Sequence, residues 1–89
     1  SGNGAAPAAG DGSVYFVQAG AFRTSDDAES QRARLAMMGM SANVSTRDQE
    51  GTTMYRVRVG PFNDKSMADA TREQLVVNGV DAVLVRLKR

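Results

Sequence analysis

The sequence predicts an α+β domain with the element order β-α-β-β-α-β, in which a four-stranded antiparallel sheet carries both helices on one face. Two observations predict this fold. The chain contains an internal repeat, because residues 14–45 align without a gap on residues 54–85 when the sequence is shifted by forty positions. Within each copy, a β-branched and aromatic run is followed by apolar residues at helical spacing and then by a second short apolar run.

The two copies share identical residues at nine aligned pairs, and the gapless spacing favours duplication over two unrelated β-α-β units that look alike. These pairs are Tyr15/Tyr55, Val17/Val57, Gly20/Gly60, Phe22/Phe62, Ala28/Ala68, Arg32/Arg72, Leu35/Leu75, Gly39/Gly79 and Ala42/Ala82.

The first and third strands are expected over residues 14–19 and 54–59, each ending at the following glycine, Gly20 or Gly60. Side chains alternate between the faces of a strand, so the residues shared by both copies should face the helices. Those residues are Tyr15, Val17, Ala19, Tyr55, Val57 and Val59. The second and fourth strands are expected over residues 42–46 and 82–87, with a hairpin turn at residues 48–51.

Each helix is expected to begin at a capping hydroxyl with an aspartate three positions later, Thr24 in the first copy and Ser66 in the second. Gly39 and Gly79 follow the helices, where a left-handed residue ends a helix. The positions expected to be buried are Ala28, Leu35, Met38, Ala68, Leu75 and Val76, with Met37 and Met40 packing at the helix end.

The chain has 89 residues, of which 42% are hydrophobic and 24% charged, which predicts one small globular domain. Residues 1–12 hold four of the nine glycines and are expected to be a flexible linker, so the domain should span residues 13–89. This linker and the basic residues near the chain end lead us to expect a C-terminal module of a longer protein.

Composition excludes most catalytic chemistry. The chain has no cysteine and no histidine, which removes thiolate nucleophiles, disulfides, cysteine-ligated metals and the commonest general base. The carboxylates of Asp26, Asp27 and Glu29 lie in a first helical turn, where capping explains them. No glycine-rich phosphate motif is present. We therefore expect a non-catalytic domain with no cofactor and no metal.

The net charge of +1 also argues against a strong polyanion binder, and no apolar run approaches the roughly 18 residues that span a bilayer. We expect no nucleic-acid partner and no direct membrane contact from this chain.

The sheet face away from the helices is the predicted binding surface. It combines an aromatic ring, an amide, two arginines and small apolar side chains that no other predicted element covers. These residues are Phe16, Gln18, Met54, Arg56, Arg58, Val83 and Val85. Two alternatives stay open, namely an ordinary solvated sheet whose arginines lie over apolar neighbours, and a protein partner on the helix faces.

The segments Tyr15–Phe22 and Tyr55–Phe62, together with the Ala28, Leu35 and Gly39 helix pattern, resemble the SPOR (sporulation-related repeat) domain of bacterial envelope proteins. The resemblance covers residues 14–87. It implies an RNP-like, ferredoxin-like fold and a monomeric module that binds septal peptidoglycan glycan strands, preferentially those denuded of stem peptides, as in FtsN-like division proteins. It also implies a location in the periplasm or cell envelope, enriched at the division septum.

The resemblance further implies that Gln18, Ala21, Arg56 and Val85 contact the glycan, through a sheet face left open by the helices. One departure is Met54, because some family members carry an aromatic residue there. The sequence thus leaves Phe16 as the candidate ring for sugar stacking.

Two domains of the same topology remain alternatives. An RNA-binding RRM also uses its open sheet face, but residues 54–61 carry arginines where its stacking rings should stand. A regulatory domain of the ACT type would bind a small molecule, normally at a dimer interface.

Overall fold

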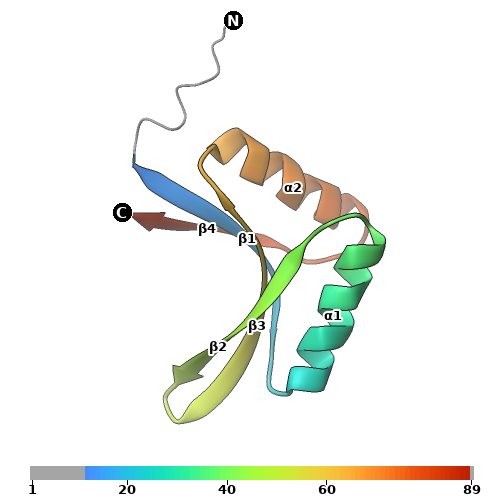
Figure 1. Cartoon of the computed structure of the whole chain (residues 1–89), viewed down its shortest axis with the longest axis vertical. Coiled ribbons are helices and arrows are strands. Elements are labelled where there is room, and N and C mark those ends of the chain that lie inside the picture. The colour runs from blue at the N-terminus through green and yellow to red at the C-terminus, as the bar shows by residue number, and fades with distance from the viewer. Residues whose placement is uncertain (1–11, 89) are drawn as a thin grey trace, which may run out of the picture.

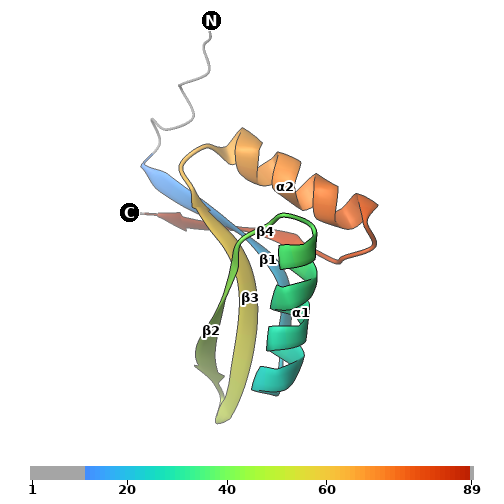
Figure 2. The ribbon, with the colours of Figure 1, turned by 45° about the vertical axis from the view of Figure 1, so that its right-hand side comes forward.

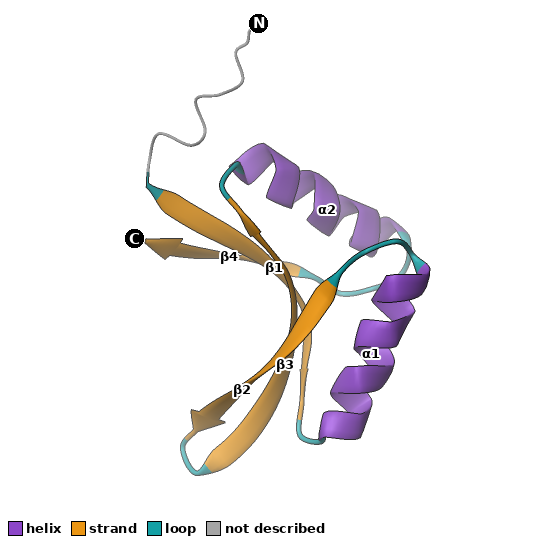
Figure 3. Ribbon diagram, in the orientation of Figure 1, coloured by secondary structure: helices purple, strands orange, loops and turns teal. Residues whose placement is uncertain are grey.

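The computed structural model describes residues 12–88 and contains the expected order of elements (Figures 1 and 3). The elements are β1 (Ser13–Phe22), α1 (Ser25–Met37), β2 (Ala42–Gln49), β3 (Thr52–Phe62), α2 (Lys65–Val77) and β4 (Val83–Lys88). The predicted linker over residues 1–12 lies outside the described residues except for Gly12.

The four strands form one antiparallel sheet in the order β2-β3-β1-β4. Both helices lie on the same side of this sheet, α1 against β1, β2 and β3 and α2 against β1, β3 and β4 (Figures 1 and 2). The predicted fold is therefore confirmed. The opposite side, which we call the open face, is covered by none of the described elements.

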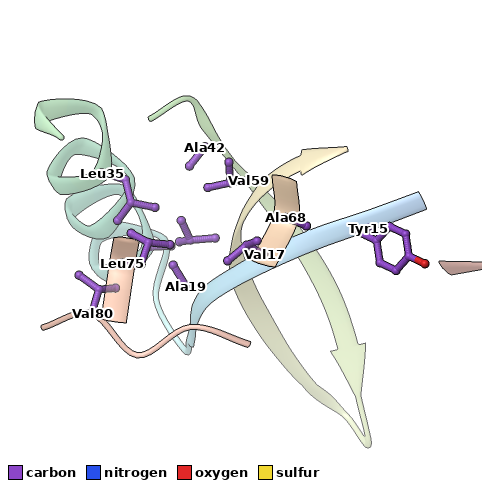
Figure 4. Close-up of a cluster of buried hydrophobic side chains, with 11 residues drawn as sticks. Tyr15, Val17, Ala19, Leu35, Ala42, Val59, Ala68, Leu75 and Val80 are labelled. Atoms are coloured by element: carbon purple, nitrogen blue, oxygen red, sulfur yellow. The ribbon is translucent and has the colours of Figure 1, made fainter. Parts of the chain in front are cut away.

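The hydrophobic core lies between the sheet and the helices (Figure 4). Tyr15, Val17 and Ala19 of β1 are buried, and they alternate with the half-buried residues that face outward. The helices contribute small and large residues at repeated positions, Ala28 and Leu35 in α1 and Ala68 and Leu75 in α2, all fully buried. The alanines carry only a methyl group, which lets each helix backbone approach the sheet while the leucines fill the space beyond.

The predicted ends of the first and third strands are wrong. Strands β1 and β3 continue through Gly20 and Gly60 as far as Phe22 and Phe62. At each glycine the pairing register between β1 and β3 shifts by one residue, which is a β-bulge. The φ angles there are +121° at Gly20 and +134° at Gly60, a region that residues with a Cβ rarely occupy. Each glycine therefore bends its strand instead of ending it.

The helix ends agree with the sequence analysis at three of four positions. The hydroxyl of Thr24 accepts a hydrogen bond of 3.1 Å from the Asp27 amide at the start of α1. Gly39 and Gly79 have φ angles of +84° and +81° just after the helices. The second cap was wrongly assigned, because it is the carboxylate of Asp64 that accepts from the Ser66 amide at 2.9 Å.

Asp64 also accepts a 2.7 Å hydrogen bond from the Ser66 hydroxyl. These contacts hold the pKa of the Asp64 carboxyl below its ordinary value, because the side-chain and backbone hydrogen bonds from Ser66 favour the charged form. The carboxylate of Asp64, two residues before Ser66, is thus the N-cap of α2, and Ser66 lies inside the first turn of the helix.

Two residues expected in the core are exposed, Met37 by 89% and Val76 by 46%. Met37 lies two positions beyond Leu35, which turns its side chain to the far side of α1, and Val76 lies one position beyond Leu75. Met38 and Met40 do pack against the core.

The hairpin between β2 and β3 is tighter than the four residues predicted. Gln49 pairs with Thr52, so only Glu50 and Gly51 form the turn, with φ angles of +52° and +83°. Positive φ at both central residues is the pattern of a type I′ turn. Strand β2 consequently runs three residues past its expected end at residue 46, and β4 is shifted by one residue relative to 82–87.

Candidate functional site on the open sheet face

The strand register brings all eight predicted site residues to the open face. Gln18 of β1 lies between Val83 of β4 and Arg58 of β3. Phe16 is opposite Val85, and Ala21 is opposite Arg56. Met54 is the next outward residue of β3, opposite Arg47 of β2.

The bulge at Gly20 puts Ala21 into this group. Three steps of β1, from Gln18 to Ala21, span the two steps of β3 from Arg58 to Arg56. An unbroken alternation starting at Gln18 would direct residue 20 outward, whereas the extra residue brings Ala21 opposite Arg56. The next residue, Phe22, then packs against the core.

Arg58 and Phe16 form a contact of the kind expected for a solvated sheet whose arginines lie over apolar neighbours, although the sequence analysis did not name this pair. The guanidinium carbon of Arg58 lies 4.4 Å from the centroid of the Phe16 ring, a cation–π geometry. Phe16 is half-buried, and one face of its ring is occupied by this guanidinium. The contact holds Arg58 in place on the sheet and leaves less of the ring available to a ligand than the sequence implied.

Three polar atoms on this face are buried without a hydrogen-bond partner, the Nε atoms of Arg56 and Arg58 and the hydroxyl of Ser45. Ser45 lies on β2 directly opposite Arg56. Buried polar groups usually find a partner, and leaving one unsatisfied costs about 1–3 kcal/mol. These atoms are not accessible as the side chains lie here, so a ligand acceptor would recover that free energy only after a side-chain rotation exposes them.

The arginines also lack a counter-charge. The pKa of Arg58 is lowered, first by burial and then by the like charges of Arg56 and Arg47. In the described part of the chain, the ion pairs within 4.0 Å all join residues of the helices. The side of the open face formed by β2 and β3 therefore favours an anionic ligand.

The open face is chemically divided. Its β1 and β4 side carries the apolar residues Phe16, Val83 and Val85, whereas its β2 and β3 side carries the arginines. A ligand with one apolar and one anionic aspect matches this division.

Sequence reasoning missed the contribution of β2, which places Asn43, Ser45 and Arg47 opposite Arg58, Arg56 and Met54. The alternation around Val44, which packs against the core, was the signal that could have found the first two. Arg47 lay outside the expected strand.

The face ends in a hollow of about 260 Å³ at the β2–β3 hairpin. Its lining was also missed, apart from Met54, and consists of Arg23, Gln49, Glu50, Thr52 and Met54. A second hollow of about 310 Å³ lies where the Gly20 bulge of β1 meets α1, and it is lined by Ala19, Gly20, Ala21, Phe22, Gln31, Arg34, Gly79, Val80 and Asp81.

No group of three or more potential metal-ligating side chains occurs within residues 12–88. Over the same residues, neither helix has the length and apolar character needed to cross a membrane.

A comparison with protein families matches residues 11–86 to the SPOR domain. Among solved structures, the SPOR domain of RlpA from Pseudomonas aeruginosa is similar with 28% identity and a TM-score of 0.70, over 82% of this chain and 99% of that one. The peptidoglycan-binding domain of the Bacillus subtilis cell wall lytic enzyme CwlC is similar with 28% identity and a TM-score of 0.72, over 85% and 91% of the two chains.

A putative exported protein from Burkholderia pseudomallei shares the fold, with 21% identity and a TM-score of 0.67. The match covers 83% of this chain and 16% of that protein.

Proposed function

Because the chain belongs to the SPOR domain family, we propose that its open face binds the glycan strands of peptidoglycan. The family consists of binding domains, so the chain is a non-catalytic module. The similar domain of CwlC is a peptidoglycan-binding domain, which supports the same class of partner here. The proposed binding domain spans residues 13–89.

The observation that carries the proposal is the pair of guanidinium groups with buried, unpartnered Nε atoms on an otherwise uncovered sheet. Muramic acid carries a lactyl carboxylate, and a guanidinium forms charge-assisted hydrogen bonds with a carboxylate. Gln18 can donate to and accept from an N-acetyl group. Val83 and Val85, on the other side of Gln18, offer apolar surface to the sugar rings.

The same arrangement accounts for a preference for denuded strands. A stem peptide converts the lactyl carboxylate to a neutral amide, which removes the partner of Arg56 and Arg58. The peptide is also bulky beside a flat sheet. A module with this preference would carry a bacterial envelope protein to sites where amidases have removed stem peptides, such as the division septum, and it would act as a monomer in the periplasm.

Co-sedimentation with purified sacculi tests the proposal. We expect the domain to pellet with sacculi and to pellet more strongly after amidase treatment removes the stem peptides. Equal binding to treated and untreated sacculi would contradict the preference, and the absence of binding to both would refute the function.

Arg56→Ala tests the site. This change should weaken glycan binding by about 1.5–3 kcal/mol if the lost hydrogen bonds to the carboxylate are buried. The domain should stay folded, because the variant removes an unpartnered Nε and a like charge beside Arg58. Arg34→Ala removes the same charge from α1 and serves as the control. Sacculus binding equal to that of the wild type would show that the sheet face is not the site.

The RNA-binding alternative predicts a different response to salt. Binding driven by phosphate contacts falls steeply with salt concentration, whereas recognition of one carboxylate among apolar and amide contacts depends on salt moderately. Measuring the dissociation constant at several salt concentrations with glycan and with RNA separates the two.

A further inference from the structure

We propose that the hollow at the β2–β3 hairpin is a second subsite of the open face, which takes the carboxylate of a further acidic sugar on the same glycan strand. This inference rests on the proposed function. It extends the binding surface beyond the eight residues predicted from the sequence, to Arg23, Thr52 and the end of β2.

The hollow is continuous with the arginine group. Met54 lines it and lies opposite Arg47, while Arg56, two residues along β3, lies opposite Ser45. Outward residues of one strand are about 7 Å apart, so the surface runs without interruption from Arg58 past Arg56 to Met54. Arg23, which directly follows β1, lies on the other side of Met54 in the hollow.

The size and lining of the hollow suit one substituent of a sugar. The hollow of about 260 Å³ is slightly smaller than the roughly 300–1,000 Å³ of sites for whole small molecules, so it has room for a lactyl substituent together with part of its sugar ring. Its lining includes Arg23, Thr52 and Met54, whose side chains carry a guanidinium, a hydroxyl and a thioether. These three groups match the carboxylate, an adjacent polar atom and the methyl group of a lactyl substituent.

The charges around the hollow favour an anion, although one acidic side chain opposes its binding. Arg23 and Arg47 have no ion-pair partner among the described residues. Glu50 lines the hollow from the hairpin turn. Its carboxylate opposes an incoming carboxylate, so its removal should strengthen binding.

The spacing matches a repeating ligand. The first anionic position lies between Arg56 and Arg58, at the level of residue 57. The second is set by Arg23, which follows Phe22 opposite Tyr55 and so comes to the level of Met54. Three residues of strand span about 10 Å, which is on the scale of one disaccharide repeat of a β-1,4-linked glycan. Successive muramic acids of one strand could then be held along β3.

The experiment compares two denuded oligosaccharides, one with a single muramic acid and one with two, prepared by amidase treatment and titrated calorimetrically against the domain. Arg23→Gln should weaken binding of the two-acid probe by roughly tenfold and leave the one-acid probe unaffected. Glu50→Gln should strengthen binding of the two-acid probe alone. Arg34→Gln, which removes a charge from α1, is the matched control.

Equal effects of Arg23→Gln on both probes, or no effect on either, would overturn the second subsite, because the hollow would then act only through its general charge or not at all. If the wild-type domain binds the one-acid and two-acid probes equally well, the inference fails while the proposed function stands. If the wild type binds neither probe nor sacculi, the proposed function fails and the inference with it.

Discussion

Replacing Gly60 by alanine adds only one methyl group, but we expect it to lower the stability of the domain strongly. A Cβ built on Gly60 lies 2.9 Å from the carbonyl oxygen of Tyr15, 3.0 Å from Phe16 Cδ1 and 3.3 Å from Phe62 Cδ2. The first of these atoms belongs to the backbone of β1 and cannot rotate away. Gly60→Ala must therefore separate β1 from β3, and it also presses on the Phe16 ring against which Arg58 packs.

The magnitude follows from two contributions. The φ angle of +134° is strained for alanine, which costs about 1–3 kcal/mol. Overpacking at a site that cannot relax adds about 1–3 kcal/mol. Together these give a loss of about 2–6 kcal/mol, a large part of the stability of a domain of this size.

Gly79→Ala is the control that introduces positive-φ strain without a close contact. Gly79 has a φ angle of +81°, but a Cβ there meets no atom within 4 Å. Alanine at this position costs only left-handed strain, about 1–2 kcal/mol, part of which is offset by the reduced entropy of the unfolded chain.

Urea unfolding followed by far-ultraviolet circular dichroism measures both variants. We expect the midpoint to fall clearly further for Gly60→Ala than for Gly79→Ala, with an unchanged slope. If the two variants lose the same free energy of unfolding, the close approach of β1 to Gly60 does not constrain the domain and the reasoning is refuted.

Other predictions concern the core and the helix caps. Leu35→Ala should lower the free energy of unfolding by about 2–5 kcal/mol because the side chain is fully buried. Met37→Ala, at an 89% exposed position, should change it by less than about 0.5 kcal/mol. Equal losses in urea unfolding would contradict the placement of Leu35 in the core and of Met37 outside it. Thr24→Ala should cost about 1 kcal/mol through the lost cap, and an unchanged thermal midpoint would show that the 3.1 Å hydrogen bond contributes nothing. Since the folded-state pKa of Asp64 lies below the ordinary value of 3.8, its stabilising contribution is present above that pH and is lost as the pH falls through the lower folded-state value. Thermal melts of Asp64→Ala and wild type should accordingly differ at pH 7 and converge in strong acid, and a difference independent of pH would exclude the charged cap.

The face on which each residue of the repeated strands lies could be predicted from the sequence. Alternation along β1 and β3, reinforced by identical residues in the two copies, separates Val17 and Val57 in the core from Gln18 and Arg58 outside. Period-two patterning is a local property, so no knowledge of the partner strand is needed.

The bulges at Gly20 and Gly60 could not be predicted in the same way. Glycine after a strand-like run is compatible with an end or with a bend, and the pairing of Phe22 with Tyr55 and of Tyr15 with Phe62 decides between them. Those contacts are distant in sequence. Ala21 was consequently expected at the site only through the family resemblance, and its position opposite Arg56 comes from the structure.

The length of β2 depends in the same way on its partner strand. The residues after Thr46 are polar and have low strand propensity, but pairing with β3 extends the strand to Gln49, and Thr53 donates a 2.9 Å hydrogen bond to Asp48 across the ladder. Strand propensity depends on such context, which is why Arg47 escaped prediction as a site residue. The contact between Arg58 and Phe16 is diagonal between neighbouring strands and needs the register to be known.

The strand order has a consequence for how this duplicated domain holds together. Every ladder in the described sheet, β2–β3, β3–β1 and β1–β4, joins a strand of residues 13–49 to a strand of residues 52–88. Neither copy of the repeat contains a strand pair of its own, so each would be a helix with two unpartnered strands. Each half therefore needs the other half to form its strand pairs. A chain cleaved at Gly51 should yield two fragments that fold only when they associate. A single repeat could form the same sheet only by pairing with a second copy of itself.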